Sequence, residues 1–216
     1  MSDSNASTPI RVFDQQYYRK FYSGRAAVHS RASVAHLAGA VLGLSKWWGL
    51  PIRSVLDIGA GPGYWRDWFA TNHPKVRYVS TDISEYACKK YAHIQQDISS
   101  WAPSQPFDLV VCQGVLQYLD NRAASRALEN LKAATSRLLY LEVPTVEDRL
   151  ATLDLSRSDL DAFWRPAAWY RSALRRSFTQ IGAGLWSRPG QLLLYEMEGA
   201  PTLRPLAPPS KKAKAR

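Results

Sequence analysis

The sequence of 216 residues predicts an α/β fold built on a mostly parallel sheet of about seven strands. Helices are expected on both faces, with an antiparallel hairpin at the C-terminal end and extra helices at the N-terminal end. Short apolar runs alternate with helical patterns between residues 52 and 143, as in parallel sheets covered by helices. The run FDLVVCQ (107–113) is apolar almost throughout, which is typical of a strand buried on both faces. A glycine-rich turn separates the first apolar run from the helix that follows it.

The N-terminal quarter is predicted to hold a leader and two helices. Residues 1–12 are polar and are expected to be disordered, whereas residues 13–51 are expected to form a helical cap. FDQQYYRKFY (13–22) predicts a short aromatic helix. A longer helix is predicted from about 25 to 44, because apolar residues recur there at helical spacing. These residues are Val34, Leu37, Ala38, Val41 and Leu44.

The central segment, 52–143, is expected to form the binding core from alternating strands and helices. The predicted strands span 54–58, 76–81, 92–97, 107–113 and 136–143. The predicted helices between them span 63–71, 84–90 and 121–134, the last with Asn121 as its cap. Strand twist makes such crossover connections right-handed, so these strands are expected to run parallel.

The alternation of strands and helices ends at Pro144. Residues 144–176 are interpreted as a mostly helical insertion after the fifth strand. Residues 177–199 are expected to supply two strands, SFTQIGAGLWS and QLLLYEME, joined through RPG as a hairpin. A single domain therefore covers 13–199, and residues 200–216 remain as a tail.

The overall composition is typical of a globular protein, with 46% hydrophobic and 21% charged residues. Two cysteines cannot form a disulfide framework, and the N-terminus lacks the basic and then apolar pattern of a signal peptide. The longest apolar-rich stretch is too short for a membrane-spanning helix of ~20 residues. We therefore expect a cytoplasmic protein without a membrane partner.

Half of the net charge of +10 lies in the tail, where Pro201–Arg216 holds five basic residues and no acid. This tail is rich in proline and then in lysine, and has too little apolar content to fold. A solubilising disordered end is the favoured interpretation, and contact with a nucleic acid is the alternative.

The stretch SVLDIGAGPG (54–63) places three glycines next to a carboxylate, Asp57. Glycine reaches backbone angles that other residues avoid and lets a ligand approach the main chain. A turn of this kind presents free N–H groups at the carboxyl edge of the sheet, where ligands bind. Its G-x-G-x-G spacing differs from the dinucleotide fingerprint, and no Lys-Ser or Lys-Thr follows as in a P-loop. Because Asp57 would repel a pyrophosphate, it favours a ligand with a positive group.

The string VLDIGAGPGYW resembles the first motif of the class I S-adenosylmethionine-dependent methyltransferases, which have a Rossmann-like fold. S-adenosylmethionine carries a sulfonium and an ammonium and no phosphate, which matches a glycine turn beside an acid. The resemblance covers residues 52–142 closely and 13–51 loosely. It implies transfer of a methyl group from S-adenosylmethionine to an oxygen or nitrogen atom of an unidentified acceptor, which we expect to be a small molecule.

The resemblance also implies where the cofactor is held. Asp82 would accept the ribose hydroxyls, Asp97 would face the adenine amine, and Ile98 would pack on the ring. Gln117 stands where many members have histidine, so a histidine-based role at that position is excluded. The predicted cofactor-binding residues are Tyr18, Asp57, Gly59, Ala60, Gly61, Gly63, Asp82, Ile83, Asp97, Ile98, Gln113, Gly114 and Val115. Capping or turn formation is the alternative for each single aspartate, but explains four successive strand ends poorly.

Catalytic residues are not defined by the sequence, because in-line methyl transfer depends mainly on positioning. Glu142, at the end of the fifth strand, is the candidate general base, and pairing with an arginine is the alternative. Acceptor contacts are expected from aromatic and basic side chains of the N-terminal helix and the insertion, with core packing as the alternative. These candidates are Tyr22, Trp164, Arg165, Trp169 and Tyr170.

A metal site is not predicted. His29 and His36 lie seven residues apart, ~10.5 Å along a helix, which is too far for one tetrahedral ion. Two other function classes stay open: an RNA or protein methyltransferase that uses the basic tail, and an NAD(P)-dependent oxidoreductase. The position of Asp57 and the glycine spacing count against the oxidoreductase.

Overall fold

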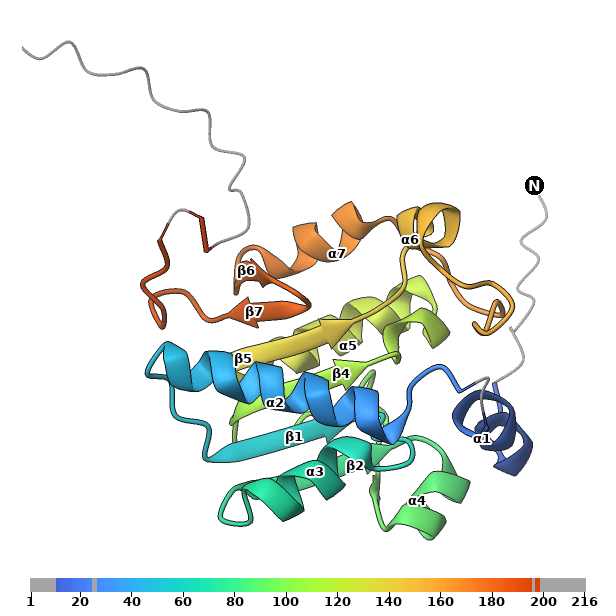
Figure 1. The fold of residues 1–216 in the computed structure, drawn as a ribbon. Helices are drawn as coiled ribbons and strands as arrows, with labels where there is room; N and C mark the ends of the chain where they lie inside the picture. Colours follow the sequence, from blue (N-terminus) through green and yellow to red (C-terminus); the bar gives the residue numbers. More distant parts are fainter. Residues whose placement is uncertain (1–10, 25–26, 196, 199–216) are drawn as a thin grey trace, which may run out of the picture.

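The computed structural model describes residues 11–24, 27–195 and 197–198, which contain a seven-stranded sheet with helices on both faces (Figure 1). The strands are β1 (Ser54–Ile58), β2 (Arg77–Asp82), β3 (Ile94–Gln95), β4 (Phe107–Gln113), β5 (Thr135–Glu142), β6 (Thr179–Gly182) and β7 (Leu185–Ser187). The helices are α1 (Gln15–Tyr22), α2 (Arg31–Trp47), α3 (Tyr64–Asn72), α4 (Glu85–Tyr91), α5 (Asn121–Ala134), α6 (Val146–Ala151) and α7 (Ala167–Leu174). A 3-10 turn, η1 (Leu116–Tyr118), follows β4. The predicted fold class is confirmed.

The strand order in the sheet is β3-β2-β1-β4-β5-β7-β6. Strands β1 to β5 pair in parallel, whereas β7 is antiparallel to both β5 and β6. The order reverses at β1, so that β2 and β3 extend to one side and β4 and β5 to the other. Because ligands of such sheets bind beyond the carboxyl ends of the strands at this reversal, the fold points to the β1–β4 edge.

Side chains of the central strands alternate between two hydrophobic clusters, one on each face of the sheet. Leu109 and Val111 of β4 pack with residues of α2 and α3. Val110 and Cys112 pack with residues of α5 and α7 on the opposite face. The two helical layers are visible in Figure 1, with α2 and α3 in front of the sheet and α5 behind it.

The same alternation gives three polar residues a common face. Asp57 of β1 pairs in register with Val111 of β4, and Gln113 of β4 pairs with Glu142 of β5. Each of the three therefore projects toward the face covered by α2 and α3. The sheet alone brings these polar groups into one row at the carboxyl ends of adjacent strands.

The N-terminal helices have clear caps. The side chain of Asp14 accepts the N–H of Tyr17 at the start of α1. The second helix begins at Arg31 rather than at 25, because Ser30 and Ser33 form a reciprocal capping box there. Residues 1–10 and 199–216, which include most of the predicted leader and the whole tail, lie outside the described residues.

The C-terminal hairpin lies earlier in the chain than predicted. Strands β6 and β7 both lie within SFTQIGAGLWS, which was predicted as one strand. Residues 191–195, after the RPG segment, form no strand. The turn uses Ala183 and Gly184 with φ of 47° and 77°. Glycine at 184 makes this left-handed turn accessible, and the hairpin closes there instead of at RPG.

Two further segments are less regular than predicted. The insertion 144–176 is helical only in α6 and α7, because side chains such as Asp154 bond to backbone N–H groups between them. The predicted strand 92–97 is reduced to Ile94–Gln95. It ends there because Asp97 accepts the N–H and the hydroxyl of Ser99 and turns the chain.

Candidate functional site

The glycine loop between β1 and α3 is built from left-handed backbone. Gly59, Gly61 and Gly63 have φ of 68°, 55° and 77°, where side chains with a Cβ are strained. A Cβ atom added to Gly59 would also overlap with Cγ2 of Val115, which follows β4. The loop therefore needs glycine for its path and for the close approach of the β4 end.

Two buried carboxylates flank this loop. Asp82 ends β2 and accepts the N–H of Gly61 through Oδ2 at 2.9 Å and the N–H of Ser84 through Oδ1 at 2.8 Å. Asp57 on β1 accepts the hydroxyl of Tyr78 at 2.8 Å. Burial raises the pKa of Asp57 to about 7, against the lowering effect of the Tyr78 hydrogen bond. A buried carboxyl with so high a pKa favours a cationic neighbour that would restore its ionised form.

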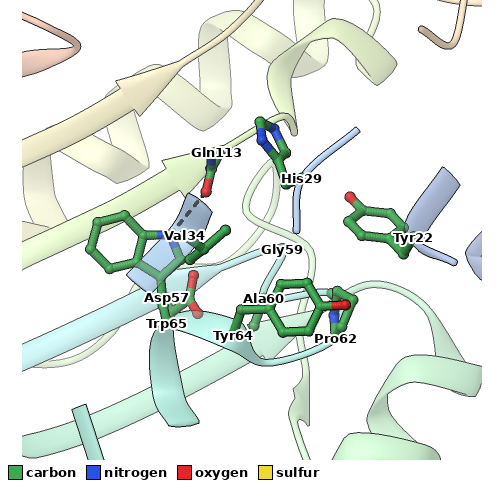
Figure 2. Close-up of a pocket in the computed structure, with 11 residues that line it drawn as sticks. Tyr22, His29, Val34, Asp57, Gly59, Ala60, Pro62, Tyr64, Trp65 and Gln113 are labelled. Atoms are coloured by element: carbon green, nitrogen blue, oxygen red, sulfur yellow. Dashed lines mark hydrogen bonds between the residues drawn. The ribbon is translucent and has the colours of Figure 1, made fainter. Parts of the chain in front are cut away.

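A pocket lies along the loop, with a volume of about 370 Å³ including its open side. It is lined by Tyr22, His29, Val34, Asp57, Gly59, Ala60, Gly61, Pro62, Tyr64, Trp65 and Gln113. Figure 2 shows His29 and Gln113 at one end of this pocket and Tyr64 and Pro62 at the other. The loop, the first strand and the segment before α2 thus surround one space.

A hydrogen-bonded network forms the β4–β5 end of the pocket. The indole of Trp65 donates to Oε1 of Gln113 at 2.9 Å, and Nε2 of Gln113 donates to Oε2 of Glu142 at 3.1 Å. The hydroxyl of Tyr140 donates to the same Oε2 at 2.8 Å. The other carboxylate oxygen, Oε1, lies 3.1 Å from Nε2 of His29. Glu142 therefore pairs with a histidine, not with the arginine considered as the alternative.

Burial raises the pKa of Glu142, but the hydrogen bonds from His29, Tyr140 and Gln113 outweigh this effect. Its pKa consequently lies below the ordinary value. The carboxyl group at the end of β5 is ionised at neutral pH and acts as an acceptor of hydrogen bonds.

Aromatic residues of α1 cover the loop. Tyr18 is 6% exposed and places its hydroxyl 3.4 Å from Oδ2 of Asp82. Tyr18 and Tyr22 also line a second cavity, of about 490 Å³ including its open side, on the α4 side of the loop. Phe13 and Tyr17 stack edge-on around Tyr118 of η1. Helix α1 is thus fastened across the carboxyl ends of β2 and β4.

The remaining predicted cofactor residues fall into different environments. Gly114 has a left-handed φ of 68°, and Val115 lies against Gly59. Ile83 is 45% exposed, whereas Ile98 is buried in the cluster that contains α5. The carboxylate of Asp97 forms the turn at Ser99 described above, which corresponds to the turn-forming alternative.

The candidate acceptor residues of the insertion mostly lie away from both cavities. The Arg165 side chain is buried, with its guanidinium donating to Asn121 Oδ1, the carbonyls of Leu116 and Leu119, and the Tyr170 hydroxyl. Tyr170 is buried in the α5 cluster, and Trp169 packs against that cluster. Trp164 lies under the guanidinium of Arg149 and is partly exposed. Only Tyr22 among these candidates lines the pocket at the glycine loop.

Three residues of the site escaped the sequence analysis. His29 was considered only as a metal ligand, and Trp65 and Tyr78 were assigned no role, yet each contacts a predicted site residue. Trp65 lies two residues after Gly63, and an indole in the first turn of the helix predicted at 63–71 was the available signal. His29 had no local signal, because its partner lies on a strand far along the chain.

Within the described part of the chain, no group of three or more His, Cys, Asp or Glu side chains is arranged to hold a metal ion. None of the described helices is both long and apolar enough to cross a membrane.

Comparison with curated proteins finds 30% identity over 119 residues to trans-aconitate 2-methyltransferase of Azoarcus sp. (strain BH72), covering 52% of this chain and 43% of that protein. A second trans-aconitate 2-methyltransferase, from Methylobacterium nodulans, is 26% identical, and the match covers 56% of that protein. The chain thus spans about half the length of the curated relatives it matches.

Two solved structures show the same fold. The N-methyltransferase NodS from Bradyrhizobium japonicum, in complex with S-adenosyl-L-homocysteine, has a TM-score of 0.52 at 18% identity, covering 81% of this chain and 97% of NodS. The plantazolicin methyltransferase BpumL has a TM-score of 0.55 at 16% identity, covering 69% of this chain and 64% of BpumL.

A family model described as methyltransferase domain matches residues 18–186, which include α2 to α7 and all of the sheet except the last residue of β7. The chain therefore belongs to the methyltransferase domain family, which confirms the resemblance to class I S-adenosylmethionine-dependent methyltransferases seen at its glycine loop.

Proposed function

We propose that this protein transfers a methyl group from S-adenosylmethionine to an oxygen or nitrogen atom of a small-molecule acceptor. The observation that carries the proposal is the pocket in which the glycine loop meets His29 and Gln113, both of which contact Glu142. The loop supplies a place for the methyl donor, and the network supplies polar groups for an acceptor beside it. Family membership removes the NAD(P)-dependent oxidoreductase as an alternative.

The residues around the loop fit S-adenosylmethionine. This cofactor carries two cationic groups, an ammonium and a sulfonium, and has no phosphate. The buried carboxylates of Asp57 and Asp82, which stand on either side of the loop, match these positive charges. The Gln117 Oε1 atom is buried, and no donor reaches it within the described residues. The amide of Gln117 lies beside Gly114, because a Cβ atom added to Gly114 would be 3.6 Å from Nε2 of Gln117. An acceptor without a donor suits a ligand that brings N–H groups.

We assign the parts of the cofactor to strand ends in the predicted order. The methionine part would lie along Gly59–Gly63 and the backbone of Gln113–Val115, and the ribose hydroxyls would meet Asp82. The adenine would lie toward Ile83, Asp97 and Ile98. When bound, S-adenosylmethionine supplies a methyl group that its sulfonium has already activated for displacement. Tyr18 and the rest of α1 would exclude water from this reaction.

The acceptor is then expected on the β4–β5 side of the pocket, near Tyr22 and the network. The curated relatives act on trans-aconitate according to their names, so carboxylic acids belong in the acceptor panel. The basic tail, which would favour an RNA or protein acceptor, lies outside the described residues.

The test is methyl transfer from radiolabelled S-adenosylmethionine to a cell metabolite extract, an RNA fraction and a protein fraction. The proposal expects label in the metabolite extract only. Label that appears only in RNA or protein would overturn the small-molecule acceptor while leaving the enzyme class intact.

A further inference from the structure

We propose that His29 is the general base of the acceptor site, oriented by Glu142, and that the acceptor atom therefore carries a proton before transfer. The chemical class this selects is a hydroxyl or an amine rather than a carboxylate. This inference rests on the proposed function.

The orientation of Glu142 follows from donors that cannot exchange roles. The Nε1–H of Trp65 can only donate, so the Gln113 atom that faces it at 2.9 Å is the carbonyl oxygen. The amide nitrogen of Gln113 must then face Glu142, and it donates to Oε2 together with the Tyr140 hydroxyl. Because Oε2 of Glu142 already accepts two hydrogen bonds, Oε1 is the oxygen that remains to accept one from His29.

This arrangement determines which nitrogen of His29 is protonated. The ionised carboxylate of Glu142 only accepts hydrogen bonds, and its Oε1 lies 3.1 Å from Nε2 of His29. The proton of the neutral ring is therefore on Nε2, and the lone pair is on Nδ1. A carboxylate that orients an imidazole in this way also stabilises the imidazolium once the ring takes up a second proton.

The position of His29 suits a base for methyl transfer. The ring lines the same pocket as Gly59, Ala60 and Gly61, and Figure 2 shows it above the glycine loop, next to Gln113. Its side chain is 30% exposed, so a proton it receives has a path to solvent. His36, seven residues later on α2, is exposed and does not line the pocket, which makes it a matched control.

The proposed step is balanced by one proton transfer. The lone pair of the acceptor oxygen or nitrogen forms a bond to the methyl carbon while the carbon–sulfur bond breaks, and its electron pair stays on sulfur. The proton on the acceptor atom moves to Nδ1 of His29, and Glu142 pairs with the resulting imidazolium. Water then removes this proton. A carboxylate acceptor has no proton to give at neutral pH and would not need His29.

The first test does not depend on activity. Nitrogen-15 NMR of the full chain with labelled histidine, assigned through a His29→Asn variant, reports which ring nitrogen of His29 is protonated. The proposal expects the neutral ring to be protonated on Nε2 with Nδ1 free. A ring protonated on Nδ1 would overturn it.

The second test measures single-turnover methyl transfer at saturating S-adenosylmethionine. The acceptors are tyramine, which offers a phenol and an amine, trans-aconitate, which offers carboxylates, and a metabolite extract. With the acceptor that wild type methylates, His29→Ala should lower the rate roughly a hundredfold or more. S-adenosylmethionine affinity should be unchanged, added imidazole should restore part of the rate, and His36→Ala should behave as wild type.

A wild-type rate in His29→Ala, or methylation of trans-aconitate alone, would overturn the base assignment. Absence of transfer to every small-molecule probe would count against the proposed function instead, and the NMR result would still decide the protonation of His29.

Discussion

The Oδ2 atom of Asp82 lies 2.9 Å from the backbone nitrogen of Gly61, so the carboxylate that ends β2 also fixes the glycine loop that follows β1. The same residue holds the start of α4 through the N–H of Ser84. Its role in the proposed cofactor site and its role in shaping that site are therefore coupled, and its replacement should affect both.

Asp82→Ala should weaken S-adenosylmethionine binding by more than the loss of a ribose contact alone. Losing hydrogen bonds to a charged acceptor costs ~1.5–3 kcal/mol, or roughly ten- to a hundredfold in affinity. Isothermal titration on a variant shown to be folded by circular dichroism measures this, with exposed Asp154→Ala as control. Unchanged affinity in a folded Asp82→Ala protein would contradict the assignment.

Asp57 should make stability depend on pH in a defined window. Its pKa is raised from 3.8 to about 7 by burial, so the folded state binds a proton between these values that the unfolded state does not. The free energy of unfolding therefore falls as pH rises through this window and levels off above it. Asp57→Asn removes this titration, and its Tm relative to wild type should increase from pH 4 to 7. A Tm difference independent of pH would contradict the prediction.

Gly59→Ala should destabilise the protein and abolish S-adenosylmethionine binding. The substitution strains a backbone with φ of 68° and pushes a methyl group into Val115; strain of this kind costs ~1–3 kcal/mol. Adding Val115→Ala should recover only part of the stability, because it removes the overlap but not the backbone strain. Denaturant unfolding measures both variants. Gly43→Ala in α2, where a Cβ would meet nothing within 4 Å, should be neutral or stabilising.

Arg165→Ala should act on the fold rather than on the acceptor. The guanidinium is buried and satisfies two backbone carbonyls, each of which costs ~1–3 kcal/mol when left without a donor. We expect a clear fall in Tm. Trp164→Ala, which removes a partly exposed ring, should leave Tm nearly unchanged. A stable Arg165→Ala enzyme with reduced kcat/KM would contradict this prediction and support a contact between Arg165 and the acceptor.

Truncation after Ala200 should leave Tm and S-adenosylmethionine affinity unchanged, because the tail contains neither apolar periodicity nor a predicted site residue. Thermal unfolding and isothermal titration of the shortened chain test this. If the truncation abolished methylation of RNA while cofactor binding remained, the small-molecule acceptor would be contradicted.

The parts of the molecule that sequence predicted well are those where a local pattern has one physical meaning. The run at β4 is apolar because both faces are covered, and the glycines before α3 are required by left-handed angles. The hairpin was misplaced because a strand-like run contains its own turn at Ala183 and Gly184. A run of this kind has no periodicity that distinguishes one long strand from two short ones.

The acceptor side of the site was less predictable because it depends on distant contacts. Glu142 was identified from its place at a strand end, but its partner His29 precedes α2 and meets it only in the folded chain. Arg165 illustrates the opposite case. A basic residue among aromatics indicated binding, yet folding places its guanidinium against the carbonyls of Leu116, which begins η1, and Leu119, which follows it.

The common face of Asp57, Gln113 and Glu142 has a consequence for how the chain tolerates insertions and deletions. Because strand side chains alternate, adding or removing one residue inside β1, β4 or β5 would turn the polar group at its end toward the α5 layer, away from the loop. Length changes between α6 and α7 would not alter the face of the sheet to which these polar side chains point. Natural or engineered length variation compatible with activity should therefore concentrate in residues 152–166, which line neither cavity, so that the spacing of donor and acceptor stays constant.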